Sequence, residues 1–242
     1  MFTRLLVGLD GSPQADAALE QAVILGRRFH SAILVASIDG REAETLADRG
    51  AFRVWGAGLT GEGLARDGAV ETTLAGLAAD VDATLVGRHG SATRPHGLGV
   101  VAAALVRQAR RPVIVCGPSA TPMKSCAVAW DGRNTRALEL AARYASVVGG
   151  TVHVIHANDD RSAGIAALGG AEAALSLLAV SFVSHVEAGD PADVVARVVR
   201  DTRADALFAG AHVPRDRQEP PRVASHTEAI LTQTVIPVVI QP

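Results

Sequence analysis

Lysine is almost absent from this chain of 242 residues, and cysteine is scarce. Lys124 is the only lysine, which excludes a phosphate-binding loop of the kind that ends in Gly-Lys-Ser or Gly-Lys-Thr. Cys116 and Cys126 are the only cysteines. Because a chain of this length can bury a sizeable core, we expect them to be buried, reduced thiols and not a disulfide.

Three further absences narrow the class of protein. The formal charge is -2, from 23 basic and 25 acidic residues, and neither half has the basic excess of a nucleic-acid-binding protein. No apolar run approaches the roughly 20 residues that span a bilayer. The first apolar run is short and is interrupted at Asp10, which does not fit a signal peptide. We therefore expect a cytoplasmic protein that binds neither nucleic acid nor membrane.

The sequence contains an internal repeat. VGLDGS at residues 7–12 returns as VAWDGR at residues 128–133, and RPVIV at residues 111–115 returns as IPVVI at residues 236–240. The stretch between these motifs also aligns. Two copies of one domain are therefore predicted, and each motif has to be judged against its counterpart.

The two copies fit two domains of ordinary size. We place the first at residues 1–118, the linker at 119–124 and the second at 125–242. Since this linker reaches no further than about 25 Å, we expect the copies to pack directly as an intramolecular pseudo-dimer. Pairing the short apolar terminal strand of each copy would remove an exposed sheet edge.

Within each copy, short apolar runs alternate with segments of helical period. This alternation predicts a doubly wound α/β fold with a five-stranded parallel sheet and right-handed crossovers. The strands expected in the first copy are 5–9, 32–38, 84–86 and 113–115, with helices at 15–25, 70–79 and 100–110. Those expected in the second copy are 127–130, 151–157, 182–186, 206–209 and 238–240, with helices at 135–148, 163–180, 191–201 and 225–234. Residues 39–68 show no clear period; a short helix over 41–49 and a lid over a site are both compatible with them.

Candidate binding residues lie where strands end. In an open parallel sheet, ligands bind beyond the carboxyl ends of the strands. Asp10 and Asp131 each close the first strand of their copy, and Gly87, Gly90 and Gly99 follow the fourth strand of the first copy. Glycines allow close approach of the backbone to phosphate, and the helix that follows offers amide donors and a favourable dipole.

This combination of an aspartate after the first strand, spaced glycines after the fourth and Pro-Val opening the fifth resembles the universal stress protein family, in both copies. The resemblance implies an adenine nucleotide alpha hydrolase-like fold that commonly dimerises through its last strand, with tandem copies replacing the dimer. It further implies that nucleotide-binding members hold ATP with the aspartate, backbone at the end of the second strand and a G-x2-G-x9-G-[ST] loop. A further homodimer of the chain is compatible with the sequence.

The first copy carries the better match to that loop. Only eight residues separate Gly90 from Gly99, and Val100 stands where the family has Ser or Thr. Losing one hydroxyl donor to a charged phosphate would cost about 1.5 to 3 kcal/mol, which weakens binding without abolishing it. The expected ATP site, with Mg, comprises Asp10, the backbone of Ile38, Gly87, Gly90, Gly99 and Val100. Arg88, His89, Arg94 and His96 could add positive charge.

The second copy departs further from the loop. Its equivalent residues are Asp131, Ala157, Gly210 and Ser225, but Val213, Pro214 and Ala224 interrupt the glycine pattern. In both copies the Asp-Gly turn also has a purely structural reading as a turn or helix cap.

No catalytic residue or metal site is expected. His153 and His156 are three apart on one strand and so point to opposite faces. His89 and His212 occupy matching loop positions because of the repeat, which does not indicate zinc. No nucleophile elbow or triad can be assembled.

The leading hypothesis is a non-enzymatic stress-response regulatory protein that binds ATP, or another adenine nucleotide, through a degenerate G-x2-G-x8-G loop in the first copy, with an unidentified protein partner. The alternative is a scaffold that binds no nucleotide and acts through protein-protein interaction. An adenylate-transferring enzyme is disfavoured, because the loop lacks lysine and acidic metal ligands.

Overall fold

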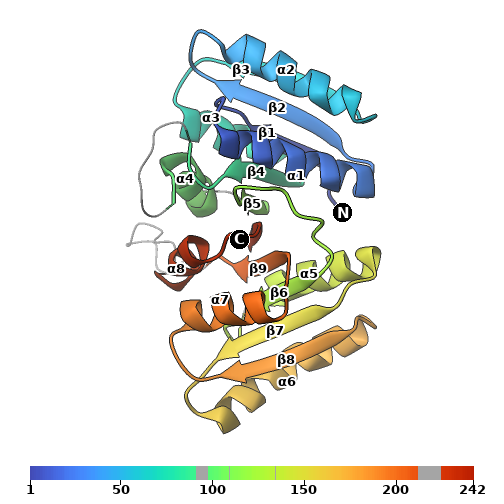
Figure 1. Cartoon of the computed structure of the whole chain (residues 1–242), viewed down its shortest axis with the longest axis vertical. Coiled ribbons are helices and arrows are strands. Elements are labelled where there is room, and N and C mark those ends of the chain that lie inside the picture. The colour runs from blue at the N-terminus through green and yellow to red at the C-terminus, as the bar shows by residue number, and fades with distance from the viewer. Residues whose placement is uncertain (91–97, 109, 134, 212–224) are drawn as a thin grey trace. The chain divides into compact units, whose positions relative to one another are not determined.

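The computed structural model describes residues 1–90, 98–108, 110–133, 135–211 and 225–242. The chain divides into two compact units, Met1–Ala120 and Thr121–Gln241, and each has the predicted α/β fold (Figure 1). Their packing as a pseudo-dimer stays a prediction, and each unit is described by itself below.

The sheet of the first unit has five parallel strands in the order β3-β2-β1-β4-β5. Its strands are β1 (Arg4–Gly8), β2 (Ala32–Ile38), β3 (Gly61–Arg66), β4 (Ala83–Gly87) and β5 (Val113–Cys116). Its helices are α1 (Pro13–Phe29), α2 (Ala43–Gly56), α3 (Val70–Leu77) and α4 (Val100–Gln108), with a 3-10 turn at Ala78–Asp80.

Local signals explain the bounds of α1. Ser12 caps the helix, because its hydroxyl accepts a hydrogen bond from the Ala15 amide at 3.2 Å, and Pro13 follows at the first helical position. His30 ends the helix in the left-handed conformation, with φ of 54°.

Residues 39–68 contain α2 and β3, so the suggested helix over 41–49 is too short, and the suggested lid stays a prediction. The helix lies very close to the sheet. A Cβ placed on Gly50 of α2 would lie 2.5 Å from a Val35 methyl group, and one placed on Gly61 of β3 would lie 2.8 Å from Val54 Cβ. Glycine therefore lets this helix and the edge strand approach each other, and the segment is part of the layer itself.

The two faces of the sheet carry different helices. A Cβ on Gly26 of α1 would meet Ile33, while one on Gly50 of α2 would meet Val35, two residues further along β2. Residues two apart on a strand share a face, so α1 and α2 cover the same side. The other two helices, α3 and α4, contact each other. Right-handed crossovers place them on the opposite side.

The second unit repeats this design with the strand order β8-β7-β6-β9-β10. Its strands are β6 (Cys126–Ala129), β7 (Val152–Ala157), β8 (Phe182–Glu187), β9 (Ala206–Gly210) and β10 (Val238–Gln241). Its helices are α5 (Thr135–Val148), α6 (Arg161–Leu177), α7 (Pro191–Asp201) and α8 (Ser225–Gln233). Asp160 and Asp190 cap α6 and α7 with carboxylate oxygens.

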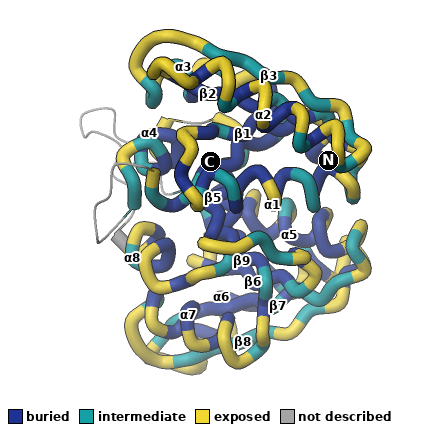
Figure 2. Tube along the Cα trace, turned by 45° about the horizontal axis from the view of Figure 1, so that its top comes forward, coloured by how far each residue is buried: buried dark blue, intermediate teal, exposed yellow. Residues whose placement is uncertain are grey.

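The core of each unit follows its central strands, which are dark blue in Figure 2. The two cysteines, both among the described residues, are buried and form no disulfide bond. In the described part of the chain, no helix is both long enough and apolar enough to cross a membrane.

Candidate functional site

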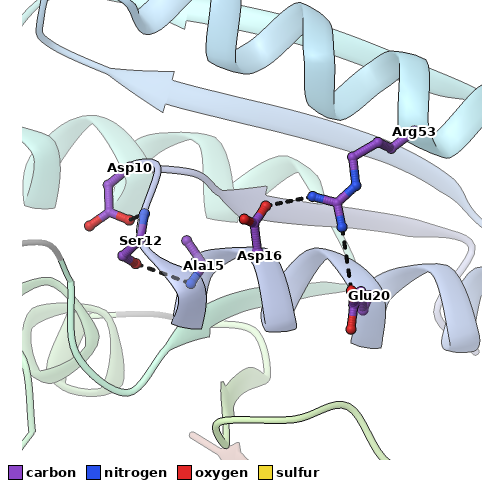
Figure 3. A network of polar contacts seen from close by, with 6 residues as sticks. All are labelled: Asp10, Ser12, Ala15, Asp16, Glu20 and Arg53. Carbon is purple, nitrogen blue, oxygen red and sulfur yellow. Dashed lines mark hydrogen bonds and ion pairs between the residues drawn. The ribbon is translucent and has the colours of Figure 1, made fainter.

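The candidate site of the first unit begins at Asp10, two residues beyond the end of β1. Its Oδ1 accepts a hydrogen bond from the Ser12 amide at 3.0 Å, which closes an Asx turn in front of α1 (Figure 3). The carboxylate is exposed. The structure therefore supports the turn role of this aspartate and still leaves it accessible to a ligand.

The start of the loop after β4 lies against this aspartate. A Cβ placed on Gly90 would lie 2.7 Å from Oδ2 of Asp10, so a glycine at this position lets the loop approach the carboxylate. The Gly99 amide donates to the Arg88 carbonyl at 2.8 Å, and a Cβ on Gly99 would lie 3.0 Å from that same oxygen. The two ends of the loop, Gly90 and Gly99, are thus brought together.

Gln14 of α1 anchors the start of the loop. Its side-chain Oε1 accepts a hydrogen bond from the His89 amide at 2.8 Å. A Cβ on Gly87 would lie 2.9 Å from the carbonyl carbon of Gln14, so the end of β4 packs directly on the first turn of α1. Sequence reasoning identified Gly87 but missed Gln14, whose only signal is its place one residue after the Ser-Pro helix start.

The remaining two residues of the first site lie at the start of a helix and the end of a strand. Val100 is the first residue of α4 and is 52% exposed. The Gly99 carbonyl accepts from the Ala103 amide, so the helix begins directly after the loop. Ile38 ends β2 and is buried, with its backbone at the carboxyl edge of the strand next to β1.

Of the loop residues expected to add positive charge, Arg88 lies inside the protein. Arg88 is only 8% exposed. Burial lowers the pKa of its guanidinium to about 10, partly offset by the nearby Cys116 thiol, whose own pKa burial raises to about 12. The expectation that Arg88 presents its charge to a phosphate is therefore wrong for this structure. His89 is half-buried, and its Nδ1 is enclosed without a hydrogen-bond partner among the described residues. Arg94 and His96 lie outside the described residues.

The second unit retains the Asx turn, because Asp131 Oδ1 accepts from the Arg133 amide at 2.8 Å. Ala157 ends β7, Gly210 ends β9 and Ser225 opens α8, as the repeat predicts. His212, Val213, Pro214 and Ala224 lie outside the described residues.

Sequence reasoning missed His156, which lies at the edge of this second site. The histidine is buried, and its Nδ1 lies 2.8 Å from the Trp130 carbonyl. A contact with a carbonyl oxygen requires a proton on Nδ1. The other ring nitrogen, Nε2, is enclosed without a partner among the described residues. The matched hydrogen bonds of Leu9 and Trp130 place His156 where the first copy has Ser37.

A cavity of about 440 Å³ opens between α1 and α2, away from these residues. It is lined by Leu19, Glu20, Val23, Ile24, Arg53, Ala57 and Ala120. Its two charged groups are already engaged, since Arg53 bridges to Asp16 at 2.5 Å and to Glu20 at 3.6 Å (Figure 3). None of the sequence-predicted site residues lines it, so it does not belong to the candidate site.

Comparisons with known proteins match a family model over part of the chain and a known fold over nearly all of it. Residues 1–54 match the model of the universal stress protein family. No curated protein matches the chain significantly. The crystal structure of a universal stress protein from Archaeoglobus fulgidus superposes with a TM-score of 0.80 at 19% identity, over 98% of this chain and 95% of that one.

Two more solved structures share the fold. A putative universal stress protein from Pseudomonas aeruginosa has a TM-score of 0.75 at 18% identity and covers 99% of this chain and 93% of its own. The cytoplasmic domain of a prokaryotic cation chloride cotransporter has a TM-score of 0.60 at 11% identity, over 99% and 95% of the two chains. At sequence identities this low, the similarity extends to the fold alone. The chain is thus similar to universal stress proteins in the sequence of residues 1–54 and in the fold of its two units.

Proposed function

We propose that this protein is a cytoplasmic regulatory protein of the stress response that binds Mg-ATP in its first unit and does not catalyse a reaction. The observation that carries the proposal is the meeting of Asp10 with Gly90 in front of α4. The aspartate and the glycine loop come from β1 and β4, which are neighbours in the sheet. They therefore form one site at its carboxyl edge.

The loop glycines leave main-chain groups exposed at this edge of the sheet. Since Gly90 and Gly99 have no side chains, an anion in front of α4 would meet main-chain groups and the positive end of the helix. A bound Mg²⁺ would add positive charge beside the phosphates, because Arg88 is buried. Val100 has no hydroxyl to donate to them. We expect binding about tenfold to a hundredfold weaker than with a serine or threonine at position 100.

We propose that the second unit binds no nucleotide. It retains the turn at Asp131, but the sequence replaces the second and third loop glycines with Val213 and Ala224. The extra side chains would occupy the space in which phosphate oxygens approach the backbone.

The position of the acidic group supports the proposal of binding without catalysis. Of the Asp10 carboxylate oxygens, Oδ1 accepts from Ser12 and Oδ2 faces Gly90. This arrangement orients a ligand better than it activates a water molecule, for which a general base must reach the attacking oxygen.

A scaffold that binds no nucleotide is the second candidate, and one observation favours it. Two amides of the loop are already used within the protein, that of His89 by Gln14 and that of Gly99 by Arg88. Fewer donors are then available to phosphate.

Isothermal titration of Mg-ATP into nucleotide-stripped protein distinguishes these candidates. Asp10→Ala and Asp131→Ala are matched variants, because both remove the acceptor of an equivalent Asx turn. We expect one ATP per chain, with binding weakened by Asp10→Ala and unchanged by Asp131→Ala. The absence of binding to the unsubstituted protein would favour the scaffold, and weakening by Asp131→Ala alone would move the site to the second unit.

A further inference from the structure

Two histidines from separate strands meet on the sheet of the second unit. His153 Nδ1 lies 3.1 Å from His185 Nε2, and the ring centroids are 5.4 Å apart. In the register of β7 and β8, His185 pairs with Ile155, two residues beyond His153. The two side chains are therefore diagonal neighbours on one face of the sheet.

We propose that His153 and His185 form a two-histidine site for a divalent late transition-metal ion. This goes beyond nucleotide binding, because the pair lies in the unit that we expect to bind no nucleotide. No metal site was expected from the sequence, because His153 and His156 lie on opposite faces of one strand. His185 is 32 residues away from His153, and a single sequence does not show that their strands pair.

The separation of the two nitrogens fits joint coordination. Nitrogens that are each about 2.0 to 2.1 Å from one ion lie about 2.9 Å apart at a right angle and about 3.4 Å apart at a tetrahedral angle. The observed 3.1 Å falls between these values. The two nitrogens therefore already lie at the separation that one shared ion requires.

The pair is accessible from solvent. β8 is the outer strand of its sheet, and α7 packs on β7. Both rings are half-buried, and the neighbouring Val183 on the same face of β8 is 44% exposed. An ion can therefore reach the nitrogens without the core opening.

Water would complete the coordination. Among the described residues, no cluster of three or more histidine, cysteine or acidic side chains could hold a metal ion. The nearest carboxylate along the same face of β8 is Glu187, which is held in an ion pair with Arg197 of α7. The site would keep open positions for water.

Burial favours the neutral imidazole, which is the form that binds a metal ion. Burial lowers the pKa of both imidazoles; His185 lowers that of His153 further, while Glu187 opposes the effect at His185. In the observed contact one ring donates a proton to the other. A metal ion needs a lone pair on each facing nitrogen, so the donating ring must move its proton to its other nitrogen, which leaves the net charge of the pair unchanged.

The donor atoms select the class of ion. Imidazole suits copper, nickel and zinc, whereas magnesium and calcium require oxygen ligands. Among divalent first-row ions, affinity for a given nitrogen site is highest for Cu²⁺. We therefore expect Cu²⁺ to bind most tightly and Zn²⁺ to compete for the same site.

The test is titration of Cu²⁺ into tag-free protein, followed by calorimetry and electron paramagnetic resonance. The variants are His153→Gln and His185→Gln, with His226→Gln as control because His226 is an exposed histidine on α8. Losing one of two linked ligands removes the chelate, so each site variant is expected to weaken the tightest binding event by about a hundredfold. The control should bind as the unsubstituted protein does.

The spectrum provides a second readout that a structural role of the histidines would not alter. Hyperfine splitting from two equatorial nitrogens is expected in the unsubstituted protein and from at most one in either site variant. Thermal unfolding of the metal-free variants checks that they remain folded. Unchanged Cu²⁺ affinity in both site variants, or a two-nitrogen signal that survives either substitution, would overturn the proposal.

Discussion

The carboxylate of Asp10 lies beside Gly90, so that a Cβ at position 90 would lie 2.7 Å from Oδ2. Gly87 meets a different kind of neighbour, because its Cβ would lie 2.9 Å from the backbone carbonyl carbon of Gln14. One glycine thus faces a side chain that can rotate, and the other faces backbone that cannot.

We predict that Gly87→Ala destabilises the protein more than Gly90→Ala does. Overpacking against fixed backbone is expected to cost about 1 to 3 kcal/mol at position 87. At position 90 the aspartate can turn away, at the cost of its hydrogen bond to Ser12, which is worth about 1 kcal/mol. Urea unfolding of the two variants checks this order; a larger loss for Gly90→Ala would contradict the close packing of β4 on α1.

Helix α6 offers a matched pair of glycine substitutions. A Cβ at Gly164 would lie 2.5 Å from a Val186 methyl group, whereas one at Gly170 would meet nothing within 4 Å. We therefore predict that Gly164→Ala destabilises the second unit, while Gly170→Ala stabilises it by about 1 kcal/mol through helix propensity. Denaturant midpoints measure both effects, and stabilisation by Gly164→Ala would show that α6 lies further from β8 than described.

The buried thiol of Cys116 predicts a loss of stability in mild alkali. Burial raises its pKa to about 12, whereas an unfolded thiol titrates near about 8.5. Above about pH 8.5 the unfolded state loses a proton that the folded state keeps. Stability from this group is therefore complete below that pH and falls by up to about 1.4 kcal/mol per pH unit up to about pH 10. Beyond that point the lowered pKa of Arg88 acts in the opposite direction.

The measurement is the unfolding free energy between pH 7.5 and 10 for the natural chain and for Cys116→Ala. The alanine variant should lose less stability over this range, because it lacks the titrating group. Parallel pH profiles for the two proteins would contradict the burial of this thiol.

The repeat and the apolar periodicity were enough to predict the α/β layers. The predicted strand at residues 32–38 and the helices at residues 135–148 and 191–201 have the observed bounds. Each of these elements is mostly apolar or has one clear apolar face. Tertiary contacts therefore did not shift its bounds from those that the sequence predicts.

The segment from residue 39 to 68 was not readable, for a physical reason. β3 faces α2 with Gly61 and Gly63, because Cβ atoms there would lie 2.8 Å from Val54 Cβ and 2.9 Å from the Ala47 carbonyl oxygen. No residue of this strand is fully buried, and glycines stand where it faces α2, so no hydrophobic period marks it. The alternating glycines were the available signal.

The candidate site was predictable in part. The Asp-Gly motif and the spaced glycines placed Asp10 and Gly90 at one edge of the sheet, where the structure brings them together. The inward position of Arg88 and the hydrogen bond from His89 to Gln14 depend on packing between residues that are distant in sequence. His153 and His185 meet through strand register, which a single sequence does not specify.

Thermal unfolding of nucleotide-stripped protein, with and without millimolar Mg-ATP, tests the central claim most directly. Mg-GTP and Mg-AMP serve as ligand controls, and Gly90→Val as the variant whose side chain would enter the space beside Asp10. At about a hundred times its dissociation constant, a ligand adds roughly 2.7 kcal/mol of stability, which raises the midpoint by several degrees. The account predicts such a rise with ATP, little with GTP, and none in Gly90→Val. An unchanged midpoint with ATP, or an equal rise in Gly90→Val, would contradict a nucleotide site in the first unit.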